Sequence, residues 1–157
     1  MGSNKRLDRL REKLCEDNLD AILVSSSENR RYLSGFTGSA GFLLISQKEA
    51  LLATDFRYLE QAAQQSPEFQ IKPIRGRFDW FPDLTYGMEA KRVGFDCAHM
   101  TVDTLSAFNS SLDKANRSIK PTLVSTKGFV DGLRVIKDSS ELNSLAKAVE
   151  IADQALD

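Results

Sequence analysis

The sequence is poor in the residues that most often build catalytic and metal-binding centres. Its 157 residues include one histidine, His99, and two cysteines, Cys15 and Cys97. A hydrolytic metal centre needs several histidine, carboxylate or cysteine ligands around one ion, with a position left open for water. Asp96, Cys97 and His99 could in principle contribute to a zinc cluster, but their tight spacing is atypical and nothing else completes a four-ligand set. We therefore predict no metal site and no catalytic residue, and interpret His99 as a partly exposed loop histidine.

Cysteine is also too sparse to form a disulfide framework. Cys15 and Cys97 lie far apart in the sequence and in no C-x-x-C pattern, so we expect a reduced, intracellular protein and a cytoplasmic location. Both thiols are expected to be small buried hydrophobic groups. The first residues lead directly into a charged segment, and no apolar run approaches the roughly 18 residues of a membrane span. We therefore expect neither a secretory signal nor a membrane partner.

An excess of positive charge is missing as well. Lys and Arg total 21 and Asp and Glu total 22, which gives a formal net charge of -1 and a pI near 5.9. The segment 75–82 mixes basic and aromatic residues, as platforms that stack single-stranded nucleic acid also do. Because the whole chain lacks a positive charge that would attract a polyanion, we interpret this segment as an aromatic cluster that holds a short helix or loop on the sheet edge. We predict no nucleic-acid partner.

The composition is otherwise that of an ordinary globular domain, with 41% hydrophobic residues, 27% charged residues and four prolines. Apolar spacing of three and four predicts helices, and short continuous apolar runs predict buried strands. The helices are expected at 4–17, 28–33, 56–65, 101–112 and 138–157, and the strands at 21–24, 42–46, 50–53, 70–74, 92–96 and 122–125. This alternation predicts an α/β fold with a mixed, mostly buried sheet and helices on both faces.

The segment 29–41 is the most distinctive part of the chain, because Gly35, Gly38 and Gly41 punctuate it at equal spacing. Such glycines indicate a shaped turn in which backbones approach closely. A dinucleotide-binding fingerprint would need a strand before the glycines and a helix after them, whereas here a helix precedes and a strand follows. Ser39 does not match the G-x-S-x-G pattern of a nucleophile elbow, and we interpret it as a turn serine that bonds its own backbone.

Three motifs, in order along the chain, resemble the amino-terminal domain of the creatinase/prolidase family. They are N-x-x-Y-L-S-G-F-T-G-S-x-G at residues 29–41, L-L-x-T-D-x-R-Y at residues 51–58 and G-L-R-x-x-K-x-x-x-E-L at residues 132–142. The third is similar to the passage into the family's catalytic domain. The family includes Xaa-Pro aminopeptidases and Xaa-Pro dipeptidases, so the resemblance implies a protein that hydrolyses peptide bonds next to proline with a metal-activated hydroxide.

The resemblance also implies a division of labour between two domains. The carboxy-terminal catalytic domain of the family holds a divalent metal pair on two Asp, one His and two Glu, and none of these ligand motifs occurs in this chain. The amino-terminal domain contributes to dimer contacts and forms part of the active-site wall, often that of the partner subunit. Residues 37–39 would then line the turn and Asp55 would brace it, unless Asp55 and Arg57 form only a helix cap and a local ion pair. The residues expected near the substrate of a partner subunit are Asn29, Tyr32, Phe36, Arg57 and Tyr58.

We therefore divide the chain into an amino-terminal domain at 4–127, a linker at 128–137 and the first helix of a truncated catalytic domain at 138–157. Asp138 and Glu141 have the spacing of a capping box. The apolar residues that follow form one helical face that needs a partner to pack on. No stop signal precedes Asp157, so we expect a second domain to follow.

The function that we predict is that of a non-catalytic domain of an Xaa-Pro metallopeptidase, inactive alone, which supports dimerisation and admits only short proline-containing peptides. Its expected partners are its own catalytic domain and a second copy of the chain. One alternative is a non-enzymatic, peptidase-like module that binds proteins or peptides. Another is a free-standing, flavodoxin-like binder of a small ligand.

Overall fold

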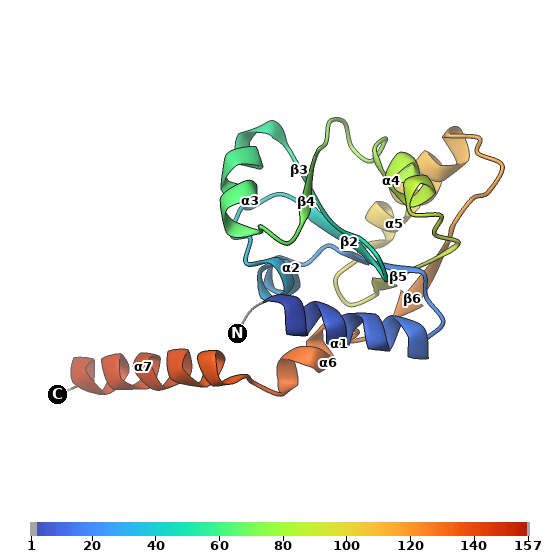
Figure 1. Ribbon diagram of the computed structural model, residues 1–157. Helices are drawn as coiled ribbons and strands as arrows, with labels where there is room; N and C mark the ends of the chain where they lie inside the picture. Colours follow the sequence, from blue (N-terminus) through green and yellow to red (C-terminus); the bar gives the residue numbers. More distant parts are fainter. Residues whose placement is uncertain (1–2, 157) are drawn as a thin grey trace.

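The computed structural model describes residues 3–156, and its centre is a six-stranded sheet with helices on both faces (Figure 1). The strand order is β4-β3-β2-β1-β5-β6, and β2 is antiparallel to both of its neighbours while the other pairs are parallel. The strands are β1 (Ala21–Val24), β2 (Phe42–Ser46), β3 (Ala50–Thr54), β4 (Gln70–Pro73), β5 (Arg92–Asp96) and β6 (Thr122–Thr126). The predicted α/β class, the hairpin and the edge position of β4 are confirmed.

The central strand β1 explains why its sequence shows no alternation of polar and apolar residues. All four of its residues are buried, and Leu23 pairs with Leu44 of β2 on one side and Phe95 of β5 on the other. Ile22 and Val24 belong to one core cluster, whereas Ala21 and Leu23 belong to a second cluster on the opposite face. A strand that contributes to two cores has to be apolar at every position.

Two groups of helices cover the two faces. The first core receives side chains from α1 (Ser3–Glu16), α2 (Ser27–Ser34), α3 (Leu59–Gln65) and α6 (Asp131–Val135), and the second core from α4 (Phe81–Gly87) and α5 (Val102–Lys114). The last helix, α7 (Ser139–Leu156), extends away from the body of the molecule (Figure 1). Between residues 3 and 156, no helix has the length and apolar character that crossing a bilayer demands.

The aromatic residues of segment 75–82 form the predicted cluster, but it lies in the second core against the inner strand β2 and not at the sheet edge. Phe78, Trp80 and Phe81 are 8%, 9% and 0% exposed. The ring of Phe108 on α5 lies 3.9 Å from that of Phe78 and 4.7 Å from that of Phe81, measured between centroids. These contacts hold α4 against α5 and the sheet.

Two sequence-based predictions about side-chain burial are wrong. Cys15 and Cys97 are exposed, because Cys15 lies on the outer side of α1 and Cys97 in the turn after β5. The apolar spacing of the helix expected at 56–65 places Phe56, Leu59, Ala62 and Ala63 on one face, but Phe56 is 77% exposed and Ala63 is also exposed. The reason is that Asp55 caps a short 3-10 helix (Phe56–Tyr58) and the α-helix begins only at Leu59, which changes the face that each residue occupies.

The predicted linker at 128–137 is not free chain over its first half. Phe129, Val130 and Leu133 are buried in the first core, and the ammonium of Lys13 on α1 donates to the carbonyl of Phe129 at 3.1 Å. Segment 129–133 therefore packs as part of the body. The division of the chain into domains stays a prediction.

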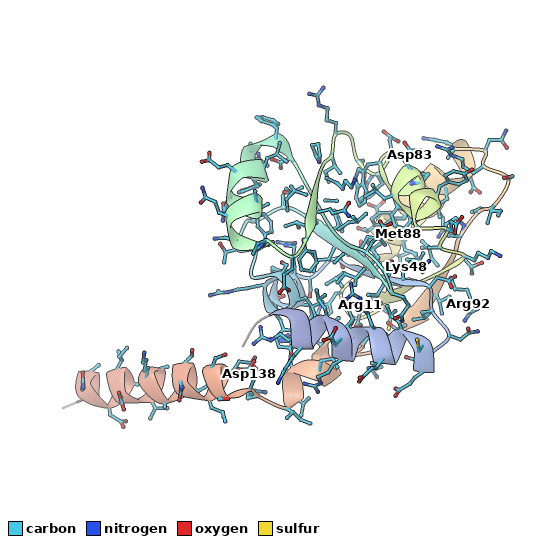
Figure 2. All side chains as sticks on the ribbon, in the orientation of Figure 1. Arg11, Lys48, Asp83, Met88, Arg92 and Asp138 are labelled. Atoms are coloured by element: carbon cyan, nitrogen blue, oxygen red, sulfur yellow. The ribbon has the colours of Figure 1, made fainter. Side chains whose placement is uncertain are left out.

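The start of α7 is fixed to α1 by charged groups. The predicted capping box is present, because the Asp138 amide donates to Glu141 and the Glu141 amide donates to Asp138, both at 2.9 Å. The Arg6 guanidinium donates to Asp138 at 2.8 Å and to the carbonyl of Tyr32 at 2.7 Å. Figure 2 shows Asp138 at the point where α6 passes into α7. Hydrogen bonds from the Ser140 side chain, the Glu141 amide and the Arg6 guanidinium together hold the pKa of the Asp138 carboxyl well below its usual range.

The stability of the Asp138→Asn variant should change less than that of wild type as the pH falls from neutral into the acid range. Because the pKa of Asp138 is lower in the folded chain, its carboxylate stabilises the fold above its unfolded pKa of about 3.9. That contribution is lost as the pH falls through the lower folded pKa. Asparagine preserves the helix cap but not the charge, so the variant should unfold at a lower temperature than wild type at neutral pH. The difference should disappear in strong acid, as followed by circular dichroism.

Asp153→Asn, which changes an exposed carboxylate on the same helix, is the matched control. Equal melting temperatures of wild type and Asp138→Asn at neutral pH would show that the Arg6–Asp138 ion pair contributes nothing.

Candidate functional site

The sheet topology brings the polar residues of interest to one edge. Strands β1, β3, β4, β5 and β6 run in the same direction, and β2 runs against them. Residues that follow β1, β3, β5 and β6 therefore lie at the same edge as residues that precede β2. Ligand sites of open α/β sheets occur at this carboxyl edge.

A glycine turn (residues 35–41) leads into β2 at this edge. Gly35 ends α2 in the left-handed conformation with φ of 77°. At Gly38, an added Cβ would lie 2.2 Å from the ring of Phe36, so no side chain fits there. Phe36 itself is 1% exposed, and its ring packs edge-on against Tyr58 with 6.0 Å between centroids. The prediction of a shaped turn is confirmed, and Phe36 anchors it.

The side chain that holds the glycine turn is Arg30, which the sequence analysis did not single out. Arg30 is 3% exposed, and its two terminal nitrogens donate to the carbonyls of Gly38 and Gly41, each at 2.7 Å. Its guanidinium also lies 5.6 Å from the ring centroid of Phe36. Burial lowers the pKa of Arg30. The two carbonyls accept from a charged donor in the interior, where such hydrogen bonds are strong.

Three of the five residues expected near a substrate face the interior of the body. Asn29 is 1% exposed, and its carbonyl accepts from Arg134 on α6 at 3.1 Å. Tyr32 is 8% exposed and donates to the carbonyl of Leu133 at 3.2 Å. Burial raises the pKa of Tyr32. With Phe36, these side chains support the turn and α6 from inside.

Arg57 faces outward beside the turn, whereas Tyr58 is partly buried and packs against the first core. Asp55 accepts from the Arg57 amide at 3.0 Å and pairs with the Arg57 guanidinium at 2.8 Å, which confirms the cap and the local ion pair. Hydrogen bonds from Arg57 hold the pKa of Asp55 below its usual value. The Tyr58 and Ser39 hydroxyls lie 2.6 Å apart, so Ser39 bonds a side chain of another element, where only its own backbone was expected.

The outer side of the glycine turn is polar. The Thr37 amide donates to the side chain of Gln65 at 2.9 Å, and the Gln61 side chain donates to the Thr37 hydroxyl at 3.0 Å. The side chain of Arg57 is 61% exposed nearby. These groups are available to a partner or a ligand that approaches the turn, and their role next to a substrate stays a prediction.

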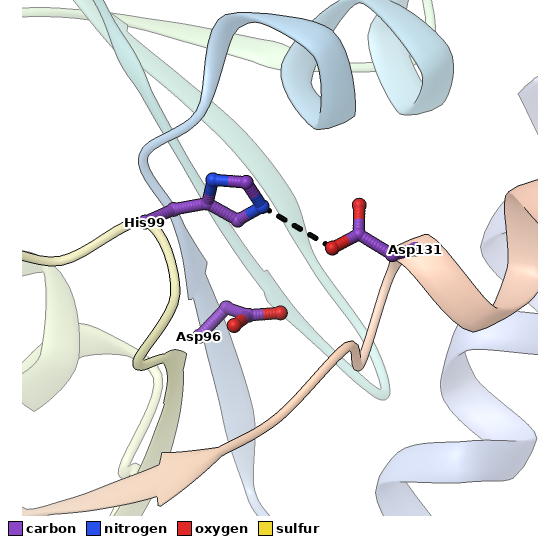
Figure 3. A group of neighbouring side chains, drawn as sticks. All are labelled: Asp96, His99 and Asp131. Carbon is purple, nitrogen blue, oxygen red and sulfur yellow. Dashed lines mark hydrogen bonds and ion pairs between the residues drawn. The ribbon is translucent and has the colours of Figure 1, made fainter.

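A second group lies further along the same edge and is called the edge cluster: Asp96, His99 and Asp131 (Figure 3). The ligand atoms of these three residues all lie within 4.8 Å of one another, and His99 Nε2 is 3.2 Å from Asp131 Oδ2. Burial raises the pKa of Asp131, but hydrogen bonds with His99 and Asn29 and the charges of His99 and Arg134 outweigh it and lower the pKa overall. The side chain of His99 is 32% exposed, as expected for a loop histidine.

Asp131 replaces Cys97 in the trio that the sequence suggested. It lies 32 positions after His99, so no local spacing reveals it, and only the return of the chain after β6 brings it to the edge. A cavity of about 10 Å³, lined by Asn29, Asp96 and His99 among others, adjoins the edge cluster. This volume holds about one water molecule.

The contribution of Arg30 can be tested with Arg30→Met. The variant leaves the carbonyls of Gly38 and Gly41 buried without a donor, and each such group costs about 1–3 kcal/mol. We expect the free energy of unfolding to fall by about 2–4 kcal/mol in urea denaturation.

Arg31→Met is the matched control, since Arg31 is the exposed neighbour on the same helix, and it should change stability by less than about 0.5 kcal/mol. If both variants unfolded at the same urea concentration, Arg30 would not hold the turn.

Comparison with known proteins identifies the fold. Residues 6–136 match the Creatinase/Prolidase N-terminal domain family. The chain is 36% identical over 151 residues to "Uncharacterized peptidase YqhT" of Bacillus subtilis (strain 168), a match that covers 96% of this chain and 41% of that protein. It is 30% identical over 138 residues to "Probable Xaa-Pro aminopeptidase P" of Ajellomyces dermatitidis, covering 76% of this chain and 22% of the relative.

Solved structures of peptidases have the same fold as this chain. An Xaa-Pro dipeptidase from Bacillus anthracis matches with a TM-score of 0.90 and 34% identity, over 99% of this chain and 42% of that one. The N-terminal domain of the cytoplasmic peptidase PepQ from Mycobacterium tuberculosis H37Rv matches with a TM-score of 0.74 and 35% identity, over 82% and 98% of the two chains. The chain spans 41% and 22% of the two curated relatives. It belongs to the Creatinase/Prolidase N-terminal domain family.

Proposed function

We propose that the chain is the non-catalytic amino-terminal part of an Xaa-Pro metallopeptidase, a proline-specific aminopeptidase or dipeptidase. The bond-breaking step then belongs to a catalytic domain with a divalent metal pair. That pair needs two Asp, one His and two Glu, and the described part of this chain brings together one group of three such side chains. The edge cluster does not fit the five-ligand set, so we assign this chain a supporting role.

The observation that carries the proposal is the uncovered apolar face of α7. Leu142, Leu145 and Val149 recur at intervals of three and four and are 56%, 53% and 59% exposed. An amphipathic helix stabilises a fold only when its apolar face packs on something. Because α7 extends away from the sheet (Figure 1), we propose that the catalytic domain covers this face.

The outer side of the glycine turn supports a role of this chain in forming the wall of a peptide-binding site. Its groups at Thr37, Ser39, Gln61 and Arg57 are polar and outward-facing, whereas Arg30 fixes the backbone beneath them. A rigid polar turn is suited to form part of the wall of a peptide-binding site. We propose that the turn lies at the active-site mouth of a partner subunit in a homodimer and excludes all but short proline-containing peptides.

Within this proposal the residues have two kinds of role. Arg57 and Tyr58 would contact the peptide or the partner subunit, and Asn29, Tyr32 and Phe36 would keep the turn in place from inside. The similarity to the cytoplasmic peptidase PepQ supports a cytoplasmic location for the whole protein.

The isolated chain should not hydrolyse Xaa-Pro substrates. We expect no release of product from an Xaa-Pro dipeptide or an Xaa-Pro-Xaa tripeptide in the presence of Mn²⁺, while the longer protein that contains the chain should cleave one of them. The measurement is amine release followed by chromatography, with a metal-free reaction as the blank. Turnover by the isolated chain would refute the proposal. An inactive longer protein that binds peptides would favour the alternative, a peptide-binding module.

Arg57→Ala in the longer protein should raise KM by a few-fold and change kcat less. A residue that contacts the substrate equally in the ground state and the transition state has this signature. Arg75→Ala, in the loop after β4, is the matched control. Unchanged kinetics with Arg57→Ala would remove this residue from the active-site wall.

A further inference from the structure

We propose that the edge cluster, formed by Asp96, His99 and Asp131, binds one divalent transition-metal ion of the Zn²⁺ type. This inference concerns residues that the proposed function does not use, and it does not depend on a peptidase activity. It rests on geometry, on the chemistry of the three side chains, on the contacts that hold them and on the space beside them.

The geometry comes from three separate points of the chain. Asp96 ends β5, His99 lies in the turn that follows, and Asp131 begins α6 after β6. Figure 3 shows the imidazole and the two carboxylates around a common space. His99 Nε2 and Asp131 Oδ2 are 3.2 Å apart. Metal–ligand bonds of about 2.0–2.2 Å at tetrahedral angles place neighbouring ligand atoms about 3.3–3.6 Å apart, so this pair is already close to the spacing of two ligands. The ligand atoms of all three residues lie within 4.8 Å of one another, so a small shift of the Asp96 carboxylate completes the set.

The donor set indicates the kind of ion. One imidazole nitrogen and carboxylate oxygens are common ligands of Zn²⁺, whereas Mg²⁺ and Ca²⁺ prefer oxygen alone. Three protein ligands leave at least one position for water. The partial exposure of His99 and Asp131 gives that water a route to solvent.

Other groups already hold the two carboxylates in place. Asp96 accepts from the amide of Ala98 at 3.0 Å and from that of Phe129 at 3.2 Å. Asp131 accepts from Arg134 through Oδ1, while its Oδ2 faces His99. Metal ligands in proteins are typically oriented by such hydrogen bonds, and a carboxylate oxygen that accepts one of them keeps a second lone pair for an ion. Arg134 can keep its contact when an ion binds at Oδ2.

The surroundings also suit a small cation. A cavity of about 10 Å³, close to the least volume that one water needs, adjoins Asp96 and His99. The carboxylates of Asp96 and Asp131, with that of Glu28 nearby, outnumber the single guanidinium of Arg134. A divalent ion would therefore enter a region of net negative charge.

A simple ion pair between His99 and Asp131 would explain the 3.2 Å contact without any metal. The two interpretations differ in one measurable respect. A structural ion pair needs no Zn²⁺, whereas a metal site binds one ion per chain and loses affinity when any ligand is removed.

The test follows the imidazole signals of His99 by NMR, because His99 is the only histidine in the chain. Metal-free chain without a histidine tag is titrated with ZnCl₂. We expect the His99 signals to change and to saturate at one Zn²⁺ per chain. Asp131→Asn and Asp96→Asn should each weaken binding by at least about tenfold. Asp103→Asn, which changes an exposed carboxylate on α5, is the matched control and should bind like wild type.

Three results would overturn the proposal. The first is no change in the His99 signals at millimolar Zn²⁺, and the second is equal affinity of wild type and Asp131→Asn. The third is binding that is lost in Cys97→Ser and kept in Asp131→Asn, which would assign the ion to the exposed thiol. Circular dichroism confirms that each variant is folded. His99→Gln, measured by calorimetry, replaces any aspartate variant that does not fold and should also bind at least about tenfold more weakly.

Discussion

The arrangement of the carboxyl edge depends on one buried charge. Glycines permit the tight path between α2 and β2, but they do not enforce it, because a glycine backbone has more conformational freedom than any other. Arg30 supplies the constraint by donating to the carbonyls of Gly38 and Gly41 from a position that is 3% exposed. Phe36 fills the space that Gly38 leaves empty. Gly38, Gly41, Phe36 and the guanidinium of Arg30 therefore pack as one unit. This unit lies beneath the polar outer side of the turn and makes it rigid.

The turn also determines which other residues lie at the carboxyl edge. It reverses the chain into β2, the one strand of the sheet in the described residues that runs against all the others. The five remaining strands all end on the side where β2 begins, so the residues after β1, β3, β5 and β6 converge there. Asn29, Asp55, His99 and Asp131 are neighbours of the same edge for this reason, although more than a hundred residues separate the first from the last.

The fold could be predicted from the sequence, but much of the site could not. The strands and long helices follow from apolar spacing that neighbouring residues carry, and β1 is apolar throughout because it contributes to both cores. Arg30 lies in a charged helical segment and looks like a surface residue, since nothing local shows that two carbonyls return to meet it. Asp131 and Arg134 reach Asn29 and His99 only through the crossover after β6. Residues 129–133 lie within the predicted linker, and their packing in the first core was not visible from the sequence for the same reason, because that core belongs to distant elements.

The contacts of segment 129–141 also fix the direction in which α7 leaves the body of the molecule. Segment 129–141 is attached at two places, first through Phe129, Leu133 and the bond from Arg134 to Asn29, and then through Arg6 at Asp138 and Glu141. Two attachments separated along a segment restrict its direction as well as its position. Helix α7 therefore leaves the body along a path that α1 and α6 define, and not through a flexible linker. The start of α7 is thereby fixed to the body, and a partner that packs on the apolar face of this helix meets it at a defined position.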